Sequence, residues 1–144
     1  MPCIVGFGEA CRIVTVEGQT AEAHATSLRD RLESRLLAMV PKLSINGDRT
    51  NRLGNNLHIS APGAPNDAVL ARLQRTVAIS TGAACSSGAQ APSHVLLAMG
   101  LSPQLQEGAL RISTGRFNTL EEIDFAASEI ARAIADVRGA MGDS

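Results

Sequence analysis

One cysteine, Cys85, lies in the stretch STGAACSSGAQAPS, which consists almost entirely of small residues. A free cysteine is often a buried structural residue, but no large apolar side chain stands beside Cys85 in the sequence. The composition favours a surface loop, and surface loops often carry function. A thiol attacks as its thiolate, which is a minor species for an unperturbed cysteine at neutral pH. The stretch contains no acid or base, so activation would have to come from a substrate group or from the start of the next helix, expected over 93–99.

A second candidate, Arg111, alternates with the apolar residues Leu110 and Ile112 in the segment GALRISTG. The alternation predicts a strand in which Arg111 points away from the core. Two interpretations stay open from the residue types alone. Arg111 is either a solvated surface arginine or a fixed guanidinium that binds a carboxylate through two parallel hydrogen bonds. Arg116, shortly after the strand, is expected to hold its own loop.

The other reactive residue types are sparse. The three histidines, His24, His58 and His94, lie far apart, and the cysteines form no C-x-x-C pair, so neither a metal site nor a disulfide framework is indicated. Cys3 and Cys11 lie in an apolar, helix-like segment and are expected to be structural. Lys42 is the single lysine and therefore the single candidate for a Schiff base.

Composition argues against two classes of partner. The formal net charge is −1 and the only aromatic residues are three phenylalanines, so nucleic-acid binding is not expected. The apolar runs are far shorter than the roughly 20 residues of a membrane-spanning helix. The first residues lack the basic-then-apolar order of a signal peptide, and the expected location is the cytoplasm.

Hydrophobic periodicity predicts one α/β domain (α+β-like) over residues 1–144. An amphipathic helix over 20–40 ends before Pro41, and Gly18 is expected to separate it from a helix-like segment before it. The clearest helix follows Thr119 and Glu122, which form a capping box. Several connections are too short for parallel crossovers, so a small, mainly antiparallel sheet with helices on one face is expected. Further helices are predicted over 65–75, with Asn66 or Asp67 as N-cap, and over 93–99, with Gly100 as its C-terminal stop, and strands over 42–47, 57–60, 77–81 and 108–115.

Longer motifs around these residues resemble a known family. The segment from Ser80 to Asp124 reads STGAACSSGAQAPSHVLLAMGLSPQLQEGALRISTGRFNTLEEID. It is similar to the C-terminal region of NifS/IscS-type cysteine desulfurases, which are pyridoxal-phosphate (PLP) enzymes of the class V aminotransferase family. The segments IVGFGEACRI, NGD and NNLHIS also fall in the family's order. The resemblance covers essentially the whole chain.

This resemblance implies sulfur transfer from L-cysteine. In the family, a loop cysteine takes the sulfur as a persulfide and L-alanine is left behind. By the match of motifs, Cys85 is the persulfide carrier and Arg111 binds the carboxylate of the substrate. The implied fold is that of the C-terminal small domain of fold-type I PLP enzymes. The long loop resembles the subgroup that passes sulfur to iron–sulfur scaffold proteins, which implies a sulfur-acceptor protein as partner.

The sequence departs from the family's pattern in several places. Ala83 stands where the motif usually has serine, and Gly54-Asn55-Asn56-Leu57-His58 replaces Pro-Asn-x-Leu-Asn. The resemblance covers about the last third of such an enzyme, so the PLP-binding large domain is expected to be absent. Lys42 lacks the Ser-x-His-Lys context of the PLP lysine, and PLP is not expected to bind this chain alone. Residues 1–18 are expected to be a former interdomain segment.

Three functions remain open from the sequence. The chain is a truncated cysteine desulfurase that needs a large-domain partner or a homo-oligomer such as a dimer, or a non-catalytic sulfur-relay or partner-binding module, or an inactive remnant. Mixing the chain with a full-length desulfurase and radiolabelled cysteine would separate the first two functions, because label on Cys85 that is lost in Cys85→Ser favours the relay.

Overall fold

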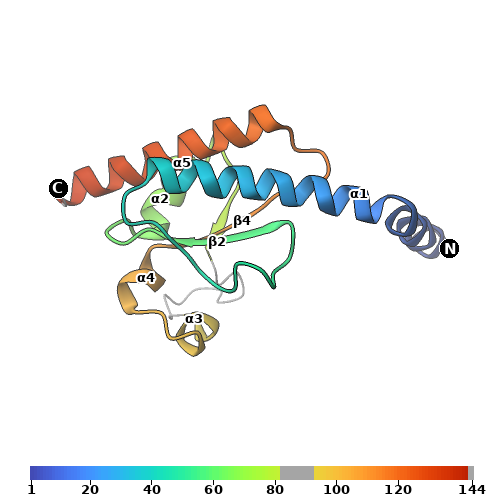
Figure 1. Ribbon diagram of the computed structural model, residues 1–144, viewed down its shortest axis with the longest axis horizontal. Helices are drawn as coiled ribbons and strands as arrows, with labels where there is room; N and C mark the ends of the chain where they lie inside the picture. The colour runs from blue at the N-terminus through green and yellow to red at the C-terminus, as the bar shows by residue number, and fades with distance from the viewer. Residues whose placement is uncertain (82–92, 143–144) are drawn as a thin grey trace.

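The computed structural model describes residues 1–81 and 93–142 of the chain. Figure 1 shows a small central sheet with long helices above it and two short helices below it. The elements, in chain order, are α1 (Pro2–Met39), β1 (Ser44–Ile45), β2 (Asn56–Ser60), α2 (Asn66–Leu73), β3 (Ser80–Thr81), α3 (His94–Ala98), α4 (Pro103–Glu107), β4 (Ala109–Ser113) and α5 (Leu120–Met141).

The four strands form one sheet in the order β1-β2-β4-β3. Every neighbouring pair is antiparallel. The central pair, β2 and β4, aligns Asn56 with Ser113 and Ser60 with Ala109. The three longer helices cover one face of this sheet (Figure 1), which confirms the fold class predicted from the sequence.

Apolar side chains from both layers form a single core. Alternation along β2 and β4 turns Leu57, Ile59, Leu110 and Ile112 toward the long helices. On α1 and α5, apolar residues recur at helical spacing and form one apolar face on each helix, which packs against these strand residues. Full burial of one such side chain stabilises the fold by about 1.5–3 kcal/mol. The buried helical residues include Leu28, Leu32 and Leu36 of α1 and Ile123, Ile130 and Ile134 of α5.

Helix α1 runs without interruption through Gly18, so the break predicted there is wrong. A glycine inside a helix costs only about 1 kcal/mol relative to alanine, which its neighbours outweigh.

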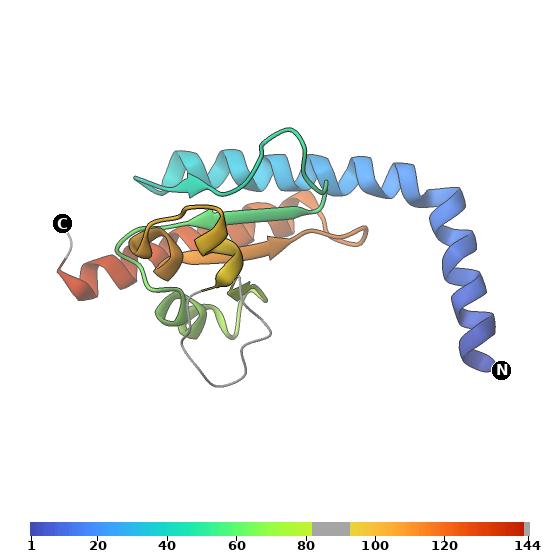
Figure 2. The same cartoon turned by 90° about the horizontal axis from the view of Figure 1, so that it is seen from below.

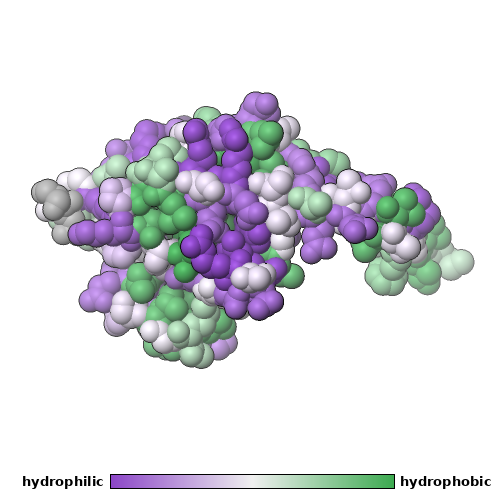
Figure 3. Space-filling model, viewed as in Figure 1, coloured by the Kyte–Doolittle hydropathy of each residue, from purple (hydrophilic) through white to green (hydrophobic). Residues whose placement is uncertain are grey.

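Figure 2 shows that α1 bends in its N-terminal part and that this part projects from the rest of the molecule. Apolar residues are exposed there (Figure 3), for example Phe7 at 73%. Cys3 and Cys11 are exposed on the same part, contrary to the structural role expected for them.

Three further details of the secondary structure differ from the predictions. The N-cap of α2 is Pro65, because Asn66 instead donates to the Ala109 carbonyl and Asp67 accepts from the Ala68 N–H. Strand β3 has two residues rather than five. Helix α4 was not predicted, since its five residues are too few to show a period. Within the described ranges, no helix is both long and apolar enough to cross a membrane.

The predicted capping box of α5 is confirmed. The Glu122 N–H donates to Thr119 Oγ1 at 3.2 Å, and the Thr119 N–H donates to Glu122 Oε2 at 3.1 Å. Both bonds satisfy amide groups that have no partner inside the helix.

Replacing Thr119 with alanine removes one of these two bonds. We expect Thr119→Ala to lower the free energy of unfolding by about 1 kcal/mol, the usual effect of losing an N-cap hydroxyl. Urea unfolding followed by far-UV circular dichroism measures this difference. Thr119→Ser keeps the hydroxyl and should stay close to the wild type, and equal losses in both variants would contradict the capping explanation.

Candidate substrate-binding site

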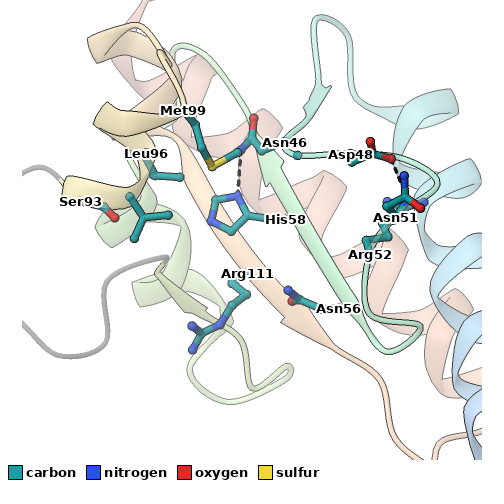
Figure 4. A pocket seen from close by; sticks show the side chains of 12 residues that line it. Asn46, Asp48, Asn51, Arg52, Asn56, His58, Ser93, Leu96, Met99 and Arg111 are labelled. Atoms are coloured by element: carbon teal, nitrogen blue, oxygen red, sulfur yellow. Dashed lines mark hydrogen bonds between the residues drawn. The ribbon is translucent and has the colours of Figure 1, made fainter.

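The face of the sheet opposite the long helices carries polar side chains. Alternation along β2 and β4 points Asn56, His58 and Arg111 to this face. His58 and Arg111 are direct cross-strand partners, an arrangement that places Cβ atoms about 4.5–5.5 Å apart. Together with the loop after β1 and with α3, they line a pocket of about 430 Å³ (Figure 4).

Arg111 brings a positive charge into this pocket. The side chain lies where the alternation of its strand predicted, off the core face, and the residue is half-buried. Among residues 1–81 and 93–142, its guanidinium forms no ion pair and donates no hydrogen bond to another group. A guanidinium in this state keeps its planar set of donors available for a carboxylate.

His58 is held beside Arg111 by Asn46. The Asn46 amide nitrogen Nδ2 lies 2.8 Å from His58 Nδ1 and 2.7 Å from Ser60 Oγ. The Asn46 backbone N–H also donates to the His58 carbonyl at 2.8 Å, next to the β1–β2 pairing. Burial lowers the pKa of His58, and the positive charge of Arg111 lowers it further. The imidazole is therefore held in its neutral form more strongly than in an exposed histidine.

The loop between β1 and β2 forms one wall of the pocket and is tied to α1. Arg52 donates to Glu33 Oε2 at 2.7 Å, Arg49 donates to Glu33 Oε1, and Arg29 Nη1 donates to the Leu53 carbonyl at 3.0 Å. Burial alone would raise the pKa of Glu33, but the hydrogen bonds and charges of Arg52 and Arg49 outweigh it and lower the pKa. The charged Glu33 carboxylate thus anchors the loop.

Asp48 is the acidic residue of this wall. Its carboxylate accepts hydrogen bonds from the backbone N–H groups of Asn51 and Thr50, at 2.7 and 2.6 Å. These two bonds lower the pKa of Asp48, which therefore stays ionised. Gly47, just before it, has a φ of 89°, which the predicted Asn-Gly turn requires.

The opposite wall of the pocket is mostly apolar. Ser93, Val95, Leu96 and Met99 of the α3 region line it. Gly100 adopts a φ of 74° directly after the helix, which confirms it as the predicted stop. A pocket with one charged side and one apolar side suits a small amphipathic molecule.

The outcome for the predicted site residues is mixed. Arg111 lines the pocket, whereas Cys85 lies outside the described residues. Arg116 pairs with Glu17 at 3.5 Å and stacks over Phe117, in agreement with a role in holding its loop. The sequence interpretation missed His58, which it considered as a possible metal ligand but did not place in a substrate-binding site. The signal was present, because alternation puts His58 on the face of Arg111 and because the family's pattern has asparagine at this position.

Lys42 does not fit the role of a PLP-binding lysine. It is exposed, lies in the turn after α1 with a φ of 59°, and is not part of the pocket lining. The chain has no other lysine. The residues of this chain therefore do not fit covalently bound PLP.

Comparison with known proteins gives the family of the chain. The family described as aminotransferase class-V matches residues 1–125. Cysteine desulfurase IscS of Colwellia psychrerythraea is 41% identical over 135 residues, which are 94% of this chain and 33% of that protein. A cysteine desulfurase of Nostoc sp. is 42% identical over 125 residues, 86% of this chain and 31% of that protein.

Solved structures give the same result. The NifS-like protein from Rickettsia africae superposes with a TM-score of 0.77 at 25% identity, over 90% of this chain and 33% of that one. Another NifS-like protein superposes with a TM-score of 0.78 at 29% identity, over 92% of this chain and 33% of that one. The chain belongs to the class V aminotransferase family. Within that family it is similar to NifS/IscS-type cysteine desulfurases, and it spans about one third of their length.

Proposed function

We propose that this chain supplies the substrate-binding arginine and the sulfur-accepting thiol of a cysteine desulfurase. Arg111 binds the carboxylate of L-cysteine, and Cys85 takes the sulfur as a persulfide while L-alanine leaves. The observation that carries the proposal is the half-buried guanidinium of Arg111 in the pocket, without a carboxylate partner in the described part of the chain. The names of the similar proteins support the choice of reaction.

The pocket is large enough to hold a small amino acid. A volume of about 430 Å³ is within the range of small-molecule pockets. The position of Cys85 in the sequence also limits how far it can lie from the pocket. Thr81 pairs with Leu110, which is next to Arg111, and Cys85 follows Thr81 by four residues. Four fully extended residues span at most about 14 Å.

The PLP chemistry of the family would have to come from another polypeptide segment or chain. Lys42, the single lysine of the chain, lies outside the pocket and does not fit a covalent bond to PLP. The projecting part of α1 offers a surface for such a partner or for a second copy, because Ile4, Val5 and Phe7 are all at least 70% exposed. Exposed apolar side chains in such a group commonly mark a protein interface.

The test combines the chain with a separately produced PLP-binding domain of a cysteine desulfurase and with L-[35S]cysteine. We expect radiolabel on the chain that thiol reductants remove, together with an equal amount of L-alanine. Cys85→Ser should abolish the label, while Cys3→Ser and Cys11→Ser, which change exposed thiols of α1, should retain it. Arg111→Gln should lower the labelling rate at low substrate about 100-fold, since a charge-assisted double hydrogen bond is lost.

The outcomes separate the candidate functions. Label that survives in Cys85→Ser contradicts the assignment of Cys85 as the sulfur carrier. Label that appears only when an intact desulfurase is the donor, and that Arg111→Gln does not change, indicates a sulfur relay without substrate binding. If neither the PLP-binding domain nor an intact desulfurase transfers label to the chain, the chain is an inactive remnant.

A further inference from the structure

The orientation of the His58 ring follows from its contact with Asn46. An amide nitrogen only donates hydrogen bonds. Because Asn46 Nδ2 lies 2.8 Å from His58 Nδ1, the ring nitrogen Nδ1 has to accept. The second amide proton of Asn46 is used by Ser60 Oγ at 2.7 Å, which fixes the amide as well. The proton of the neutral imidazole is therefore on Nε2, on the other side of the ring.

The Nε2 side of the ring faces the pocket. Figure 4 shows the imidazole edge opposite Asn46 turned toward the space that Arg111 and Leu96 also line. Within residues 1–81 and 93–142, no group forms a hydrogen bond with Nε2. The pocket thus contains two sets of unused donors from adjacent strands, the guanidinium of Arg111 and the Nε2–H of His58.

We propose that His58 is a second substrate-binding residue, whose Nε2–H donates to the same carboxylate that Arg111 binds. This inference rests on the proposed function of Arg111 and adds a specificity element to it. Asn46 is the positioning residue, because it keeps Nδ1 as an acceptor and so keeps the donor on the pocket side. The site selects a carboxylate because Arg111 and His58 both donate hydrogen bonds into it. A protonated amine would be repelled by the charge of Arg111 and would find no acceptor on either residue.

The charges around the ring give the site a defined pH dependence. Arg111 is the cross-strand partner of His58 on β4, and Asp48 and Arg52 line the pocket from the loop. Asp48 is bonded to backbone N–H groups and Arg52 to Glu33, while the lining side chains from α3 carry no charge. Protonation of Nδ1 would break the bond from Asn46, because an N–H cannot accept from an amide N–H, so the ring donates from Nε2 in its neutral form. Burial and the charge of Arg111 lower the pKa of His58, so affinity should vary little with pH above that lowered pKa and fall once the ring becomes protonated.

Nitrogen-15 NMR of the imidazole groups tests the assignment directly. In the free chain, His58 should show the Nε2–H tautomer, and Asn46→Ala should allow a mixture of both tautomers. Addition of L-cysteine should shift the His58 Nε2 and Arg111 Nε signals together. Cysteamine, which lacks the carboxylate, should shift neither signal, and His24 and His94 serve as internal references.

Two variants of His58 test whether its Nε2–H contributes to L-cysteine binding. His58→Phe keeps a ring without a donor and should weaken L-cysteine binding about tenfold at neutral pH, the loss expected for one hydrogen bond to a charged group. His58→Asn restores the residue of the family's pattern and should bind with little dependence on pH. Amide spectra that match the wild type outside the pocket show that both variants are folded.

Four results overturn the inference. An Nδ1–H tautomer in the free chain contradicts the derived orientation of the ring. A shift of Arg111 without a shift of His58, or the same affinity in His58→Phe, removes His58 from the site and leaves the proposed function of Arg111 intact. If L-cysteine shifts neither residue, both the inference and the carboxylate-binding role of Arg111 fail.

Discussion

Gly108→Ala is expected to lower the free energy of unfolding by about 3 kcal/mol, near the upper end of the usual effect of overpacking. Gly108 lies between α4 and β4, where a Cβ atom would come within 2.2 Å of the Ala61 carbonyl oxygen and 2.8 Å of its carbon. The obstructing atoms belong to a fully buried stretch of backbone, so they cannot rotate aside. The Ala61 N–H also donates to the Gly108 carbonyl at 3.0 Å, and the required shift would weaken this bond as well.

Gly139→Ala is the matched control for the same chemical change. Gly139 lies inside the last part of α5, and an added Cβ would meet no atom within 4 Å. Alanine favours the helix by up to about 1 kcal/mol over glycine, so this variant should be as stable as the wild type or slightly more stable. Urea unfolding by far-UV circular dichroism suits both variants because the chain has no tryptophan or tyrosine. A Gly108→Ala protein that unfolds at the wild-type urea concentration would contradict the close approach to Ala61.

The elements that the sequence could predict are those with a repeating physical signal. Alternation in GALRIS places Leu110 and Ile112 in the core and Arg111 on the opposite face. Side chains of a strand can point only to one face of the sheet or the other. Thr119 and Glu122 mark the start of α5 because their spacing allows two reciprocal bonds. These features depend on neighbours within one turn or one strand, which a local pattern contains.

The elements that the sequence missed depend on contacts between distant segments. Gly18 does not end α1, since a propensity cost of about 1 kcal/mol is small against a helix that continues on both sides. Asn66 does not cap α2, because β4 offers its side chain a carbonyl at Ala109. The alignment of His58 with Arg111 requires the register of β2 against β4, which no local pattern in either strand specifies.

The ionic cluster around Glu33 was also outside the reach of sequence patterns. Glu33 follows Leu32 on α1 and reads as an ordinary polar residue of an amphipathic helix, yet its side chain is only 6% exposed. It is buried because the loop after β1 folds over it and supplies Arg49 and Arg52. The two partners lie 16 and 19 residues away in the sequence, so the cluster appears only in the folded chain.

Glu33→Gln is expected to destabilise the fold by about 2–4 kcal/mol, because removing one partner of a buried ion pair leaves the other without compensation. Arg52 is the residue left behind, with a side chain only 16% exposed. Its Nε already has no hydrogen-bond partner among the described residues, and its other carboxylate neighbour, the exposed Asp30, lies 3.9 Å from Nη2, beyond hydrogen-bond distance. Glu9→Gln is the control, since Glu9 and its partner Arg12 are each more than half exposed and such pairs contribute little.

The pH dependence of this difference identifies its cause. The pKa of Glu33 is lowered in the folded chain, so its contribution is fully present above the unfolded pKa and is lost as the pH falls through the folded pKa. The stability gap between the wild type and Glu33→Gln should therefore stay constant near neutral pH and shrink in the acidic range below the usual pKa of glutamate. A gap that persists unchanged at the lowest pH where both proteins fold would show that packing, and not charge, is lost.

Because Arg52 and Asp48 belong to the same pocket wall, the NMR signal of His58 should also move in Glu33→Gln, which links the anchor on α1 to the geometry of the site.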